Sequence, residues 1–416
     1  MRTLLIALAC LGSSSAALAM PQEAQSAWRE DLAIYAQRLE ASHIDLFHTL
    51  SRDVFLAELA AIEQALPHLS EGEVVARLMR LHHSVGDGHT SIPLWDSGYH
   101  RFPVDIEIVA GRALIIGTRD EDVAMLGGEI LAVDGRPFDE VASRLAEYAP
   151  FVENDGSRAV RSAAYFPIAE LMAAINLVDD AHHMRLEIEQ GGERQELILE
   201  ARPGEAYNDT LVHRLDYRLP LDPSGINASA NGIGFSYFED QRLGYIRYDF
   251  YPSASEMDRF ASEVVATMRR EEGRYLVIDF RDNYGGDFFI GLRLAHALNL
   301  LDGVDWNSGV FVLTSPFTFS AAMSNSAQFS DILNARRIGE PTGATPCGYQ
   351  DMGQFNLPNS GLLITYSKRH FCFAEPENDA LQPDHFVPVS RENWVDGQDA
   401  AMAWVFDEVE RLSAAE

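Results

Sequence analysis

The sequence predicts an α/β protein, and three observations support this fold class. Apolar residues recur at helical spacing from about residue 24 to residue 80, whereas short alternating strands occupy residues 102–201. From residue 233 onward, apolar strands alternate with helices, which is typical of βαβ units around a mainly parallel sheet. Hydrophobic residues make up 47% and charged residues 23% of the 416-residue chain, so a large core is expected and global disorder is excluded.

Residues 1–19 have the pattern of a secretory signal peptide. Arg2 supplies the positive charge, residues 4–11 form an apolar run, and residues 17–19 form an Ala-Leu-Ala cleavage site. The apolar run is too short to span a bilayer, which requires ~20 residues, and no other stretch is long and charge-free enough. We therefore expect an exported protein, periplasmic or secreted, and Cys10 leaves a lipoprotein as the alternative.

Residues 20–97 form the first predicted unit of the mature chain, which is helical. Apolar residues at helical spacing mark two helices: Leu32, Tyr35 and Leu39, then Phe55, Leu59 and Ile62. Ser70 and Glu73 have the spacing of a capping box, so a third helix is expected to begin there and to include Leu81.

Residues 98–205 form a second, β-rich unit, and residues 206–232 are rich in turn-forming residues and are expected to be a linker. The expected strands alternate apolar and polar residues: 104–108, 185–188 and 196–199. Gly191-Gly192 has the form of a hairpin turn between the last two strands. Asp134-Gly135 predicts a turn between an apolar strand and a helix over residues 138–145.

Residues 233–416 form the third predicted unit, an α/β core. Its expected strands are 245–248, 275–280, 310–314 and 361–366. Its expected helices are 257–270, 290–300 and 320–332.

The charge balance excludes some partners. Lys and Arg number 32 against 63 for Asp and Glu, so the formal net charge is -31, and binding to nucleic acid or to anionic lipid is not expected. We expect neither a cofactor nor a metal, because the cysteines, like His82, His83 and His89, lack a metal-ligand spacing. Cys347 and Cys372 are the cysteines left after signal cleavage, and their pairing stays open.

Ser320 is the candidate nucleophile. It follows the strand ending at Thr314 and begins a helix of small residues, where backbone N–H groups favour developing negative charge. A plain N-cap serine is the alternative, since Ser is a preferred cap. Gly285 and Gly286 end another strand segment, at the sheet edge where ligands bind, so either could supply a second oxyanion donor.

His89 is the candidate base. It lies in the Gly-rich segment Gly86-Asp87-Gly88-His89-Thr90, where side chains are positioned by a turn rather than packed in a core. An imidazole there could accept the proton of a serine hydroxyl. A histidine taken at random is more often structural or exposed, so this residue alone decides nothing.

Taken in order, these segments resemble the tail-specific (C-terminal processing) family of serine peptidases. The similarity is greatest to the branch with the tricorn core protease and the interphotoreceptor retinoid-binding protein repeats. Its most specific part is the serine turn together with Gly339-Glu340-Pro341-Thr342-Gly343. The resemblance covers nearly all of the mature chain. It implies a crotonase-like (ClpP-like) core over 233–416 and a PDZ-like domain over 98–205.

The resemblance also implies roles for individual residues. Ser320 would be the nucleophile and His89 the general base, and N–H groups of Ala321 and of Gly285 or Gly286 would form the oxyanion hole. A downstream glutamate supports the site in the tricorn branch, and here Glu377 matches best, with Glu375 second. Tyr284 and Phe319, two aromatic residues near the site, are expected to contact the substrate.

Three positions depart from the family pattern. The processing-protease branch uses a Ser–Lys dyad, but the only lysine of this chain is Lys368, on a later strand, so a lysine base is excluded. The acidic residue three positions after the nucleophile is replaced by Met323. Gly88 stands where the tricorn branch has serine, which leaves open what orients the His89 ring.

The expected function is therefore an exported serine peptidase that acts on peptides or proteins. The alternative is a binding protein on the same fold that holds a small apolar ligand or a peptide without turnover. Hydrolysis of a non-peptide ester would use the same residues. The sequence leaves the cleavage preference and the oligomeric state open.

Overall fold

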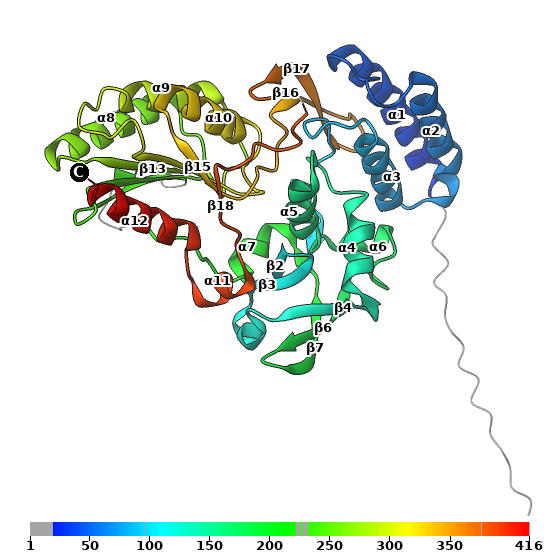
Figure 1. The fold of residues 1–416 in the computed structure, drawn as a ribbon. Coiled ribbons are helices and arrows are strands. Elements are labelled where there is room, and N and C mark those ends of the chain that lie inside the picture. Colours follow the sequence, from blue (N-terminus) through cyan, green and yellow to red (C-terminus); the bar gives the residue numbers. More distant parts are fainter. Residues whose placement is uncertain (1–19, 96, 222–225, 228–231, 376, 416) are drawn as a thin grey trace, which may run out of the picture.

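The computed structural model describes residues 20–95, 97–221, 226–227, 232–375 and 377–415. The predicted signal peptide over 1–19, with the lipoprotein alternative at Cys10, lies outside the described residues. The chain has a mixed α/β fold in which a helical unit, a β-rich unit and an α/β core follow one another (Figure 1). This confirms the α/β class predicted from the sequence.

The first unit is helical, as its apolar spacing predicts. Its elements are α1 (Gln22–Ser42), α2 (Arg52–Ala65), the 3-10 helix η1 (Leu66–His68) and α3 (Glu71–His83). The predicted capping box begins α3: the Glu73 N–H donates to Ser70 Oγ, and the Ser70 N–H donates to Glu73 Oε2 at 2.7 Å. The loop after α3 carries His89, so this unit delivers the candidate base.

The β-rich unit contains an antiparallel sheet in the order β2-β3-β4-β6-β7, with β5 beside β4 and β9 beside β3. Its elements are β1 (His100–Arg101), β2 (Val104–Val109), β3 (Arg112–Thr118), η2 (Asp120–Met125), β4 (Glu129–Val133), β5 (Arg136–Pro137), α4 (Phe138–Ala146), α5 (Asp155–Tyr165), α6 (Ala169–Ala174), β6 (His183–Gln190), β7 (Glu193–Glu200) and β8 (Arg202–Pro203). The turns at Asp134-Gly135 and Gly191-Gly192 form where predicted, with positive φ at all four residues. Helices α5 and α6 have no counterpart in the sequence prediction.

The segment predicted as a linker, 206–232, carries short elements. They are the end of η3 (Gly204–Ala206), α7 (Tyr207–Thr210), β9 (His213–Arg214) and β10 (Ile226–Asn227). Strand β9 pairs with β3, and β10 pairs with β11 of the core. The described part of this segment therefore contributes a strand to each of the two larger sheets.

The core sheet runs in the order β10-β11-β12-β13-β14-β15-β18 and is parallel from β12 to β18. Its further elements are β11 (Ile233–Phe238), β12 (Leu243–Tyr248), α8 (Ala254–Arg270), β13 (Tyr275–Asp279), α9 (Phe288–Leu298), β14 (Val310–Thr314), α10 (Ala321–Leu333), β15 (Arg336–Gly339), β18 (His385–Phe386), α11 (Arg391–Asp396) and α12 (Ala400–Ser413). Because β13 and β14 are paired and parallel, the segments that follow them, 280–286 and 315–320, meet at one edge of the sheet.

Helices cover both faces of the core sheet. Figure 1 shows α8, α9 and α10 on one face and α12 on the other. Successive strand residues point to opposite layers: Ile278 packs with Phe260 and Leu294, whereas Val277 packs with Val405 of α12. None of the helices in the described part of the chain is long and apolar enough to cross a membrane.

A hairpin of β16 (Cys347–Asn356) and β17 (Leu363–Cys372) lies between the core and the N-terminal helices (Figure 1). Cys347 and Cys372 form a disulfide across the open end of this hairpin, which answers the question that the sequence left open. The strand predicted over 361–366 therefore begins two residues later and extends to Cys372.

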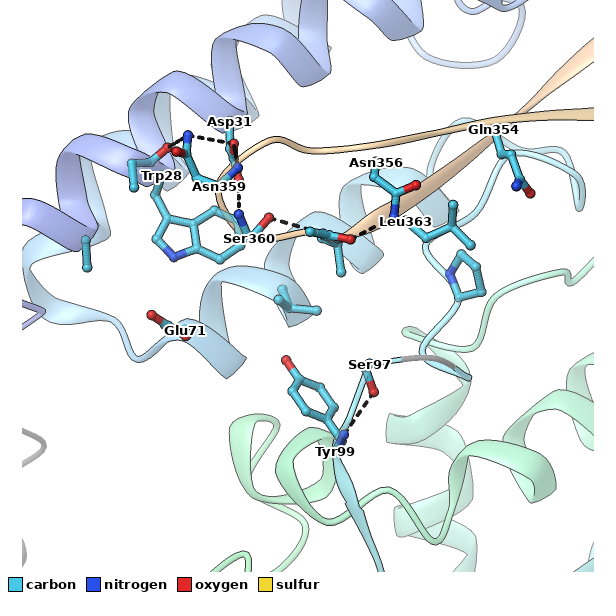
Figure 2. Close-up of a pocket in the computed structure, with 16 residues that line it drawn as sticks. Trp28, Asp31, Glu71, Ser97, Tyr99, Gln354, Asn356, Asn359, Ser360 and Leu363 are labelled. Atoms are coloured by element: carbon cyan, nitrogen blue, oxygen red, sulfur yellow. Dashed lines mark hydrogen bonds between the residues drawn. The ribbon is translucent and has the colours of Figure 1, made fainter. Parts of the chain in front are cut away.

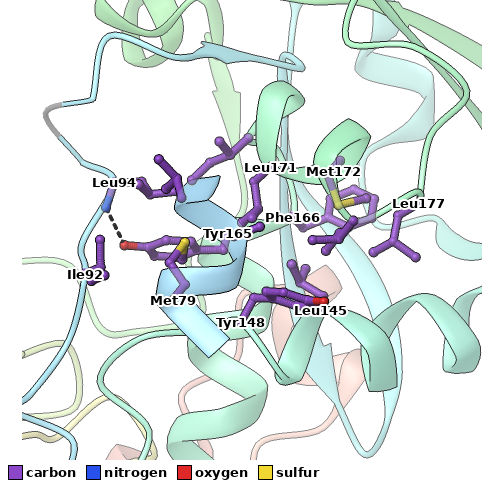
Figure 3. Packing of buried hydrophobic residues seen from close by; sticks show 14 of the residues in the cluster. Met79, Ile92, Leu94, Leu145, Tyr148, Tyr165, Phe166, Leu171, Met172 and Leu177 are labelled. Atoms are coloured by element: carbon purple, nitrogen blue, oxygen red, sulfur yellow. Dashed lines mark hydrogen bonds between the residues drawn. The ribbon is translucent and has the colours of Figure 1, made fainter. Parts of the chain in front are cut away.

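One hydrophobic cluster joins the first unit to the β-rich unit. Figure 3 shows part of it, with Met79 of α3 near Tyr165 of α5 and with Phe166 and Leu171 behind. The Leu94 N–H donates to Tyr165 Oη at 2.9 Å. This packing fixes α5 against the helix that precedes His89.

Candidate active site

Ser320 occupies a strained turn between β14 and α10. Its φ is 51° and its ψ is -122°, a backbone conformation that a residue with a Cβ rarely adopts. A serine held on such a strand-to-helix turn presents its hydroxyl away from the backbone, as a nucleophile requires. The Ser320 side chain makes no capping hydrogen bond to α10, so the plain N-cap interpretation is wrong.

Hydrogen bonds hold the Ser320 turn against the loop that follows β13. Phe319 N–H donates to the Asn283 carbonyl at 3.0 Å, and Thr318 Oγ1 donates to the Phe280 carbonyl at 2.9 Å. Gly343 N–H donates to the Thr318 carbonyl at 3.1 Å, which connects the Gly-Glu-Pro-Thr-Gly loop to the same turn. The three segments that the sequence singled out in the core therefore meet at one place.

Backbone donors surround the Ser320 hydroxyl. Ala321 is the first residue of α10, so its N–H has no acceptor within the helix. A Cβ on Gly285 would lie 2.6 Å from the Ser320 Cβ and 3.1 Å from the Ala321 nitrogen, so only glycine allows this approach. Gly285 N–H itself donates to Asn283 Oδ1 at 2.8 Å, which favours Gly286 as the second candidate oxyanion donor.

The His89 ring lies directly beside Ser320. His89 Nε2 is 2.8 Å from Ser320 Oγ, although 231 positions separate the two residues. The ring stacks on Phe319 with centroids 5.4 Å apart. His89 is only 3% exposed, so water has little access to the contact.

Asp87 orders the turn that carries His89. Its Oδ1 accepts N–H groups of His89 and Thr90 at 3.1 and 2.8 Å, and it accepts the Ser367 hydroxyl of β17 at 2.6 Å. Its Oδ2 lies 2.9 Å from His43 Nε2. Burial would raise the pKa of the Asp87 carboxyl, but hydrogen bonds from His43 and Ser367 outweigh it and hold the pKa below its usual value.

Glu153, which sequence reasoning missed, contacts the other nitrogen of the His89 ring. Glu153 Oε1 is 3.1 Å from His89 Nδ1, and Glu153 Oε2 accepts the Thr345 N–H at 2.7 Å. Both side chains are buried, at 4% exposure for His89 and 7% for Glu153. An ionised carboxylate only accepts hydrogen bonds, so Nδ1 carries the ring proton and Nε2 is free to accept one from Ser320.

Gly88 makes room for Glu153. A Cβ at position 88 would lie 2.5 Å from Glu153 Cγ and 2.6 Å from Glu153 Oε1. The departure from the family pattern at position 88 thus coincides with a new partner for the imidazole. No local sequence signal marks Glu153, which lies 64 positions from His89.

The remaining predicted residues lie as follows. Glu377 and Glu375 are exposed in the segment after β17, and among the described residues Glu153 is the acid that contacts His89.

Tyr284, 41% exposed, and Phe319 lie beside the site, and both rings contact the guanidinium of Arg161. Lys368 pairs with Asp351 across the hairpin at 3.1 Å, and Met323 is buried in a cluster with Phe319.

A polar cavity lies away from this site. A cavity of about 510 Å³ is lined by residues of α1, α3 and the β16–β17 hairpin, and contains none of the candidate catalytic residues. Figure 2 shows that Asp31 within it accepts hydrogen bonds from the backbone of Asn359 and Ser360, so this carboxylate fastens the hairpin tip to α1. Within the described residues, no group of three His, Cys, Asp or Glu side chains could hold a metal ion.

Comparison with known proteins finds similarity in structure only. No protein-family model and no curated protein sequence matches the chain. The structure of mature CPAF aligns with a TM-score of 0.61 at 13% identity, covering 94% of this chain and 98% of that chain. Mature CPAF complexed with lactacystin aligns at 0.60 and 13%, covering 94% and 99%. The photosystem II D1 C-terminal processing protease aligns at 0.40 and 13%, covering 92% and 99%.

The CPAF structures establish the fold, because the alignment extends over nearly the whole of both chains. The CPAF structures are tail-specific serine peptidases, so the resemblance stated from the sequence motifs is confirmed at the level of fold. The chain therefore has the fold of a tail-specific serine peptidase.

Proposed function

We propose that this protein is a serine peptidase in which Ser320, His89 and Glu153 form the catalytic triad. The observation that carries the proposal is the continuous chain of contacts from Ser320 Oγ through the His89 ring to Glu153, at 2.8 and 3.1 Å. A nucleophile, a base within hydrogen-bond reach and a third group that orients the base are the parts that covalent catalysis requires.

In the acylation step, Ser320 Oγ attacks the carbonyl carbon of the scissile peptide bond while His89 Nε2 takes the hydroxyl proton. The imidazolium that forms gains stabilisation from the Glu153 carboxylate at Nδ1. His89 then gives the proton to the leaving amine, and the C–N bond breaks. Water repeats the sequence on the acyl-enzyme, and the acid product leaves.

The oxyanion of each tetrahedral intermediate is stabilised by N–H groups of Ala321 and Gly286. The support for Ala321 is its place at the start of α10, where the N–H lacks a helical acceptor. The support for Gly286 is that the neighbouring Gly285 N–H already donates to Asn283. A missing oxyanion donor costs roughly 100- to 1000-fold in turnover.

The finer assignments of fold are also proposals. The parallel strands β12 to β18, with helices on both faces, support a crotonase-like core. The antiparallel sheet with α4 supports a PDZ-like unit, which would bind an extended peptide by strand addition. Glu153 lies between α4 and α5 of that unit, so a peptide held there would lie close to the triad.

We further propose that the protein is exported to the periplasm or secreted. The disulfide between Cys347 and Cys372 supports this, because disulfides persist in oxidising compartments. Fractionation of cells that express the full chain, followed by N-terminal sequencing, tests it. A mature chain that begins at Met20 is expected, whereas an uncleaved cytosolic protein would contradict it.

Peptide hydrolysis tests the proposed activity. The wild-type protein is incubated with a defined mixture of synthetic peptides, and the products are identified by mass spectrometry. Ser320→Ala is expected to cleave none of them. Ser330→Ala is the matched control, because it removes a hydroxyl from the same helix ten residues further on, about 15 Å along the axis.

Two other activities are separated by the same assay. Ester substrates of matched acyl groups reveal whether the protein acts on esters alone. A wild-type protein that binds peptides but cleaves neither class would favour a non-catalytic binding role. Nothing at the described site favours that role over catalysis, since the cavity of about 510 Å³ lies away from Ser320 and has a polar lining that includes Asp31 and Asn359.

A further inference from the structure

A partly buried cation lies beside the proposed triad. Arg161, on α5, holds its guanidinium over the Tyr284 ring, with the central carbon 4.1 Å from the ring centroid. The Phe319 and Phe151 centroids lie at 5.1 and 5.3 Å. Phe319 directly precedes the nucleophile and stacks on His89, so the guanidinium is separated from the reacting groups by a single ring.

Arg161 forms no ion pair among the described residues, although the charge of Glu153 acts on it from further away, and its Nε is enclosed without a hydrogen-bond acceptor. Two other arginines that are largely enclosed are paired. Arg281 donates to Asp279 and to Asp399, each at 2.7 Å, and Arg218 lies 3.0 Å from Asp249. Arg161 therefore differs from Arg281 and Arg218 because it has no carboxylate partner.

The aromatic rings compensate the charge only in part. A cation over an aromatic face gains less than a desolvated guanidinium loses when no anion accepts its hydrogen bonds. Burial lowers the pKa of Arg161, yet an arginine side chain stays protonated in proteins. The planar group with its remaining N–H donors is thus prepared for a carboxylate, which it can bind with two parallel hydrogen bonds.

We propose that Arg161 binds a carboxylate of the substrate next to the scissile bond, and so selects peptides that carry one there. The carboxylate comes either from an acidic side chain or from the C-terminus of the peptide. The inference rests on the proposed peptidase function and names its specificity. With a formal net charge of -31, the protein repels acidic peptides over most of its surface, so a single desolvated cation gives local selection.

Paired peptides test the inference on the full-length mature enzyme. After one cleaved peptide is found, Glu and Gln are compared at each position around its cleavage site, and a free C-terminal carboxylate is compared with an amide. The ratio of kcat/KM within the favoured pair is expected to be about 10- to 100-fold. A ratio near 1 in every pair, with cleavage proceeding, would overturn the inference and leave the peptidase function intact.

Variants on α5 identify the cation responsible. Arg161→Gln is expected to reduce the favoured ratio to near 1, and Arg161→Lys to retain part of it. Arg158→Gln is the matched control, since Arg158 is an exposed arginine of the same helix that pairs with Asp155, and its ratio should equal that of the wild type. A ratio preserved in Arg161→Gln would overturn the inference.

A binding measurement keeps the two proposals distinguishable. Ser320→Ala protein is titrated with fluorescein-labelled peptides from the synthetic mixture, each prepared as a Glu and Gln pair and as a free-acid and amide pair, and anisotropy reports the dissociation constants. The carboxylate peptide is expected to bind at least tenfold more tightly than its neutral partner, and adding Arg161→Gln should remove the difference. If this result is obtained while the wild type hydrolyses no peptide, the carboxylate site stands and the peptidase proposal fails. Equal binding within all pairs would overturn the carboxylate site.

Discussion

The Glu153 side chain lies beside the His89 ring because Gly88 has no side chain of its own. Glu153 fills the volume that any side chain at position 88 would need. The imidazole therefore takes its orientation from an acid of the β-rich unit, and the hydroxyl that the tricorn branch places before its histidine is absent. Two positions far apart in the chain act as a unit, so each should be sensitive to substitution.

Glu153→Gln should lower kcat by about 100- to 10,000-fold with a smaller effect on KM. The amide can donate to Nδ1 and so favour the wrong ring tautomer, and it cannot stabilise the imidazolium. Steady-state kinetics on a cleaved peptide measures the change. Glu377→Gln is the comparison, because the resemblance assigned the supporting role to Glu377. If Glu377→Gln were the more damaging of the two, the assignment of Glu153 would be wrong.

Gly88→Ala should reduce activity by a similar mechanism. The new Cβ would lie 2.5 Å from Glu153 Cγ, so the carboxylate has to move away from His89. We expect a loss of at least tenfold in kcat/KM with a folded protein. Gly348→Ala, on the hairpin, is the control because a Cβ there meets no atom within 4 Å. Full activity in Gly88→Ala would contradict the account of this contact.

These residues show which part of the site the sequence could predict. Ser320 and His89 lie in short motifs whose residue types state their chemistry, and the structure brings them together. Glu153 could not be predicted, because its role comes from a contact between units 64 positions apart. Gly88 indicated that the His89 ring has a different partner from that in the tricorn branch. A missing side chain does not show which residue occupies its space.

At the scale of elements, long periodic helices and buried parallel strands were predictable, whereas the hairpin β16–β17 was predicted only in part. Its strands mix buried, half-buried and exposed residues without a regular alternation, and its ends are joined by a disulfide that spacing alone could not establish. Helix α5 was missed, and with it both Arg161 and the loop of Glu153. The hairpin contacts the site through Thr365 and Ser367, which bind the His89 turn, and Thr345, two residues before the hairpin, donates to Glu153.

Loss of the disulfide should therefore affect both stability and activity. The Cys347→Ala/Cys372→Ala variant removes a cross-link between residues 25 positions apart and should lower the free energy of unfolding by about 3 kcal/mol. Because Thr345 lies two residues before Cys347, kcat/KM should fall roughly tenfold through the weakened Thr345–Glu153 hydrogen bond. Denaturant titration and kinetics measure the two effects.

Treatment with a thiol reductant provides the control. Reduction of the wild type should reproduce the behaviour of the double variant, while the double variant itself should not respond to reductant. Unchanged activity in the reduced wild type would show that the hairpin does not position the triad.

At the scale of the whole molecule, buried carboxyls lie where the core meets the β-rich unit. Burial raises the pKa of Glu340 to about 7, although a backbone hydrogen bond from Val389 and the charge of Arg281 both lower it. Burial, with the nearby carboxylates of Asp105 and Asp282, also raises the pKa of Glu107 on β2. Both acids bind protons more tightly in the folded state than in the unfolded chain, where a glutamate titrates near pH 4.3.

The contribution of Glu340 to stability should consequently fall as the pH rises from about 4.5 to about 7. Glu340→Gln keeps an acceptor for Val389 N–H but removes the titration, so it should stabilise the protein by about 2 kcal/mol at pH 8 and have little effect at pH 4. Thermal or denaturant unfolding across this range measures the difference. Glu375→Gln, an exposed acid, is the control. A pH-independent effect of Glu340→Gln would contradict the assignment.

Three units of the fold meet at the contact between Ser320 and His89, and covalent labelling tests its proposed catalytic role most directly. The mature protein is treated with a fluorophosphonate, and the modified residue is located by mass spectrometry of its peptides. We predict one adduct, on Ser320, formed at a rate that His89→Ala reduces by at least 100-fold. An unlabelled but correctly folded protein, or an adduct on another serine, would contradict the central claim.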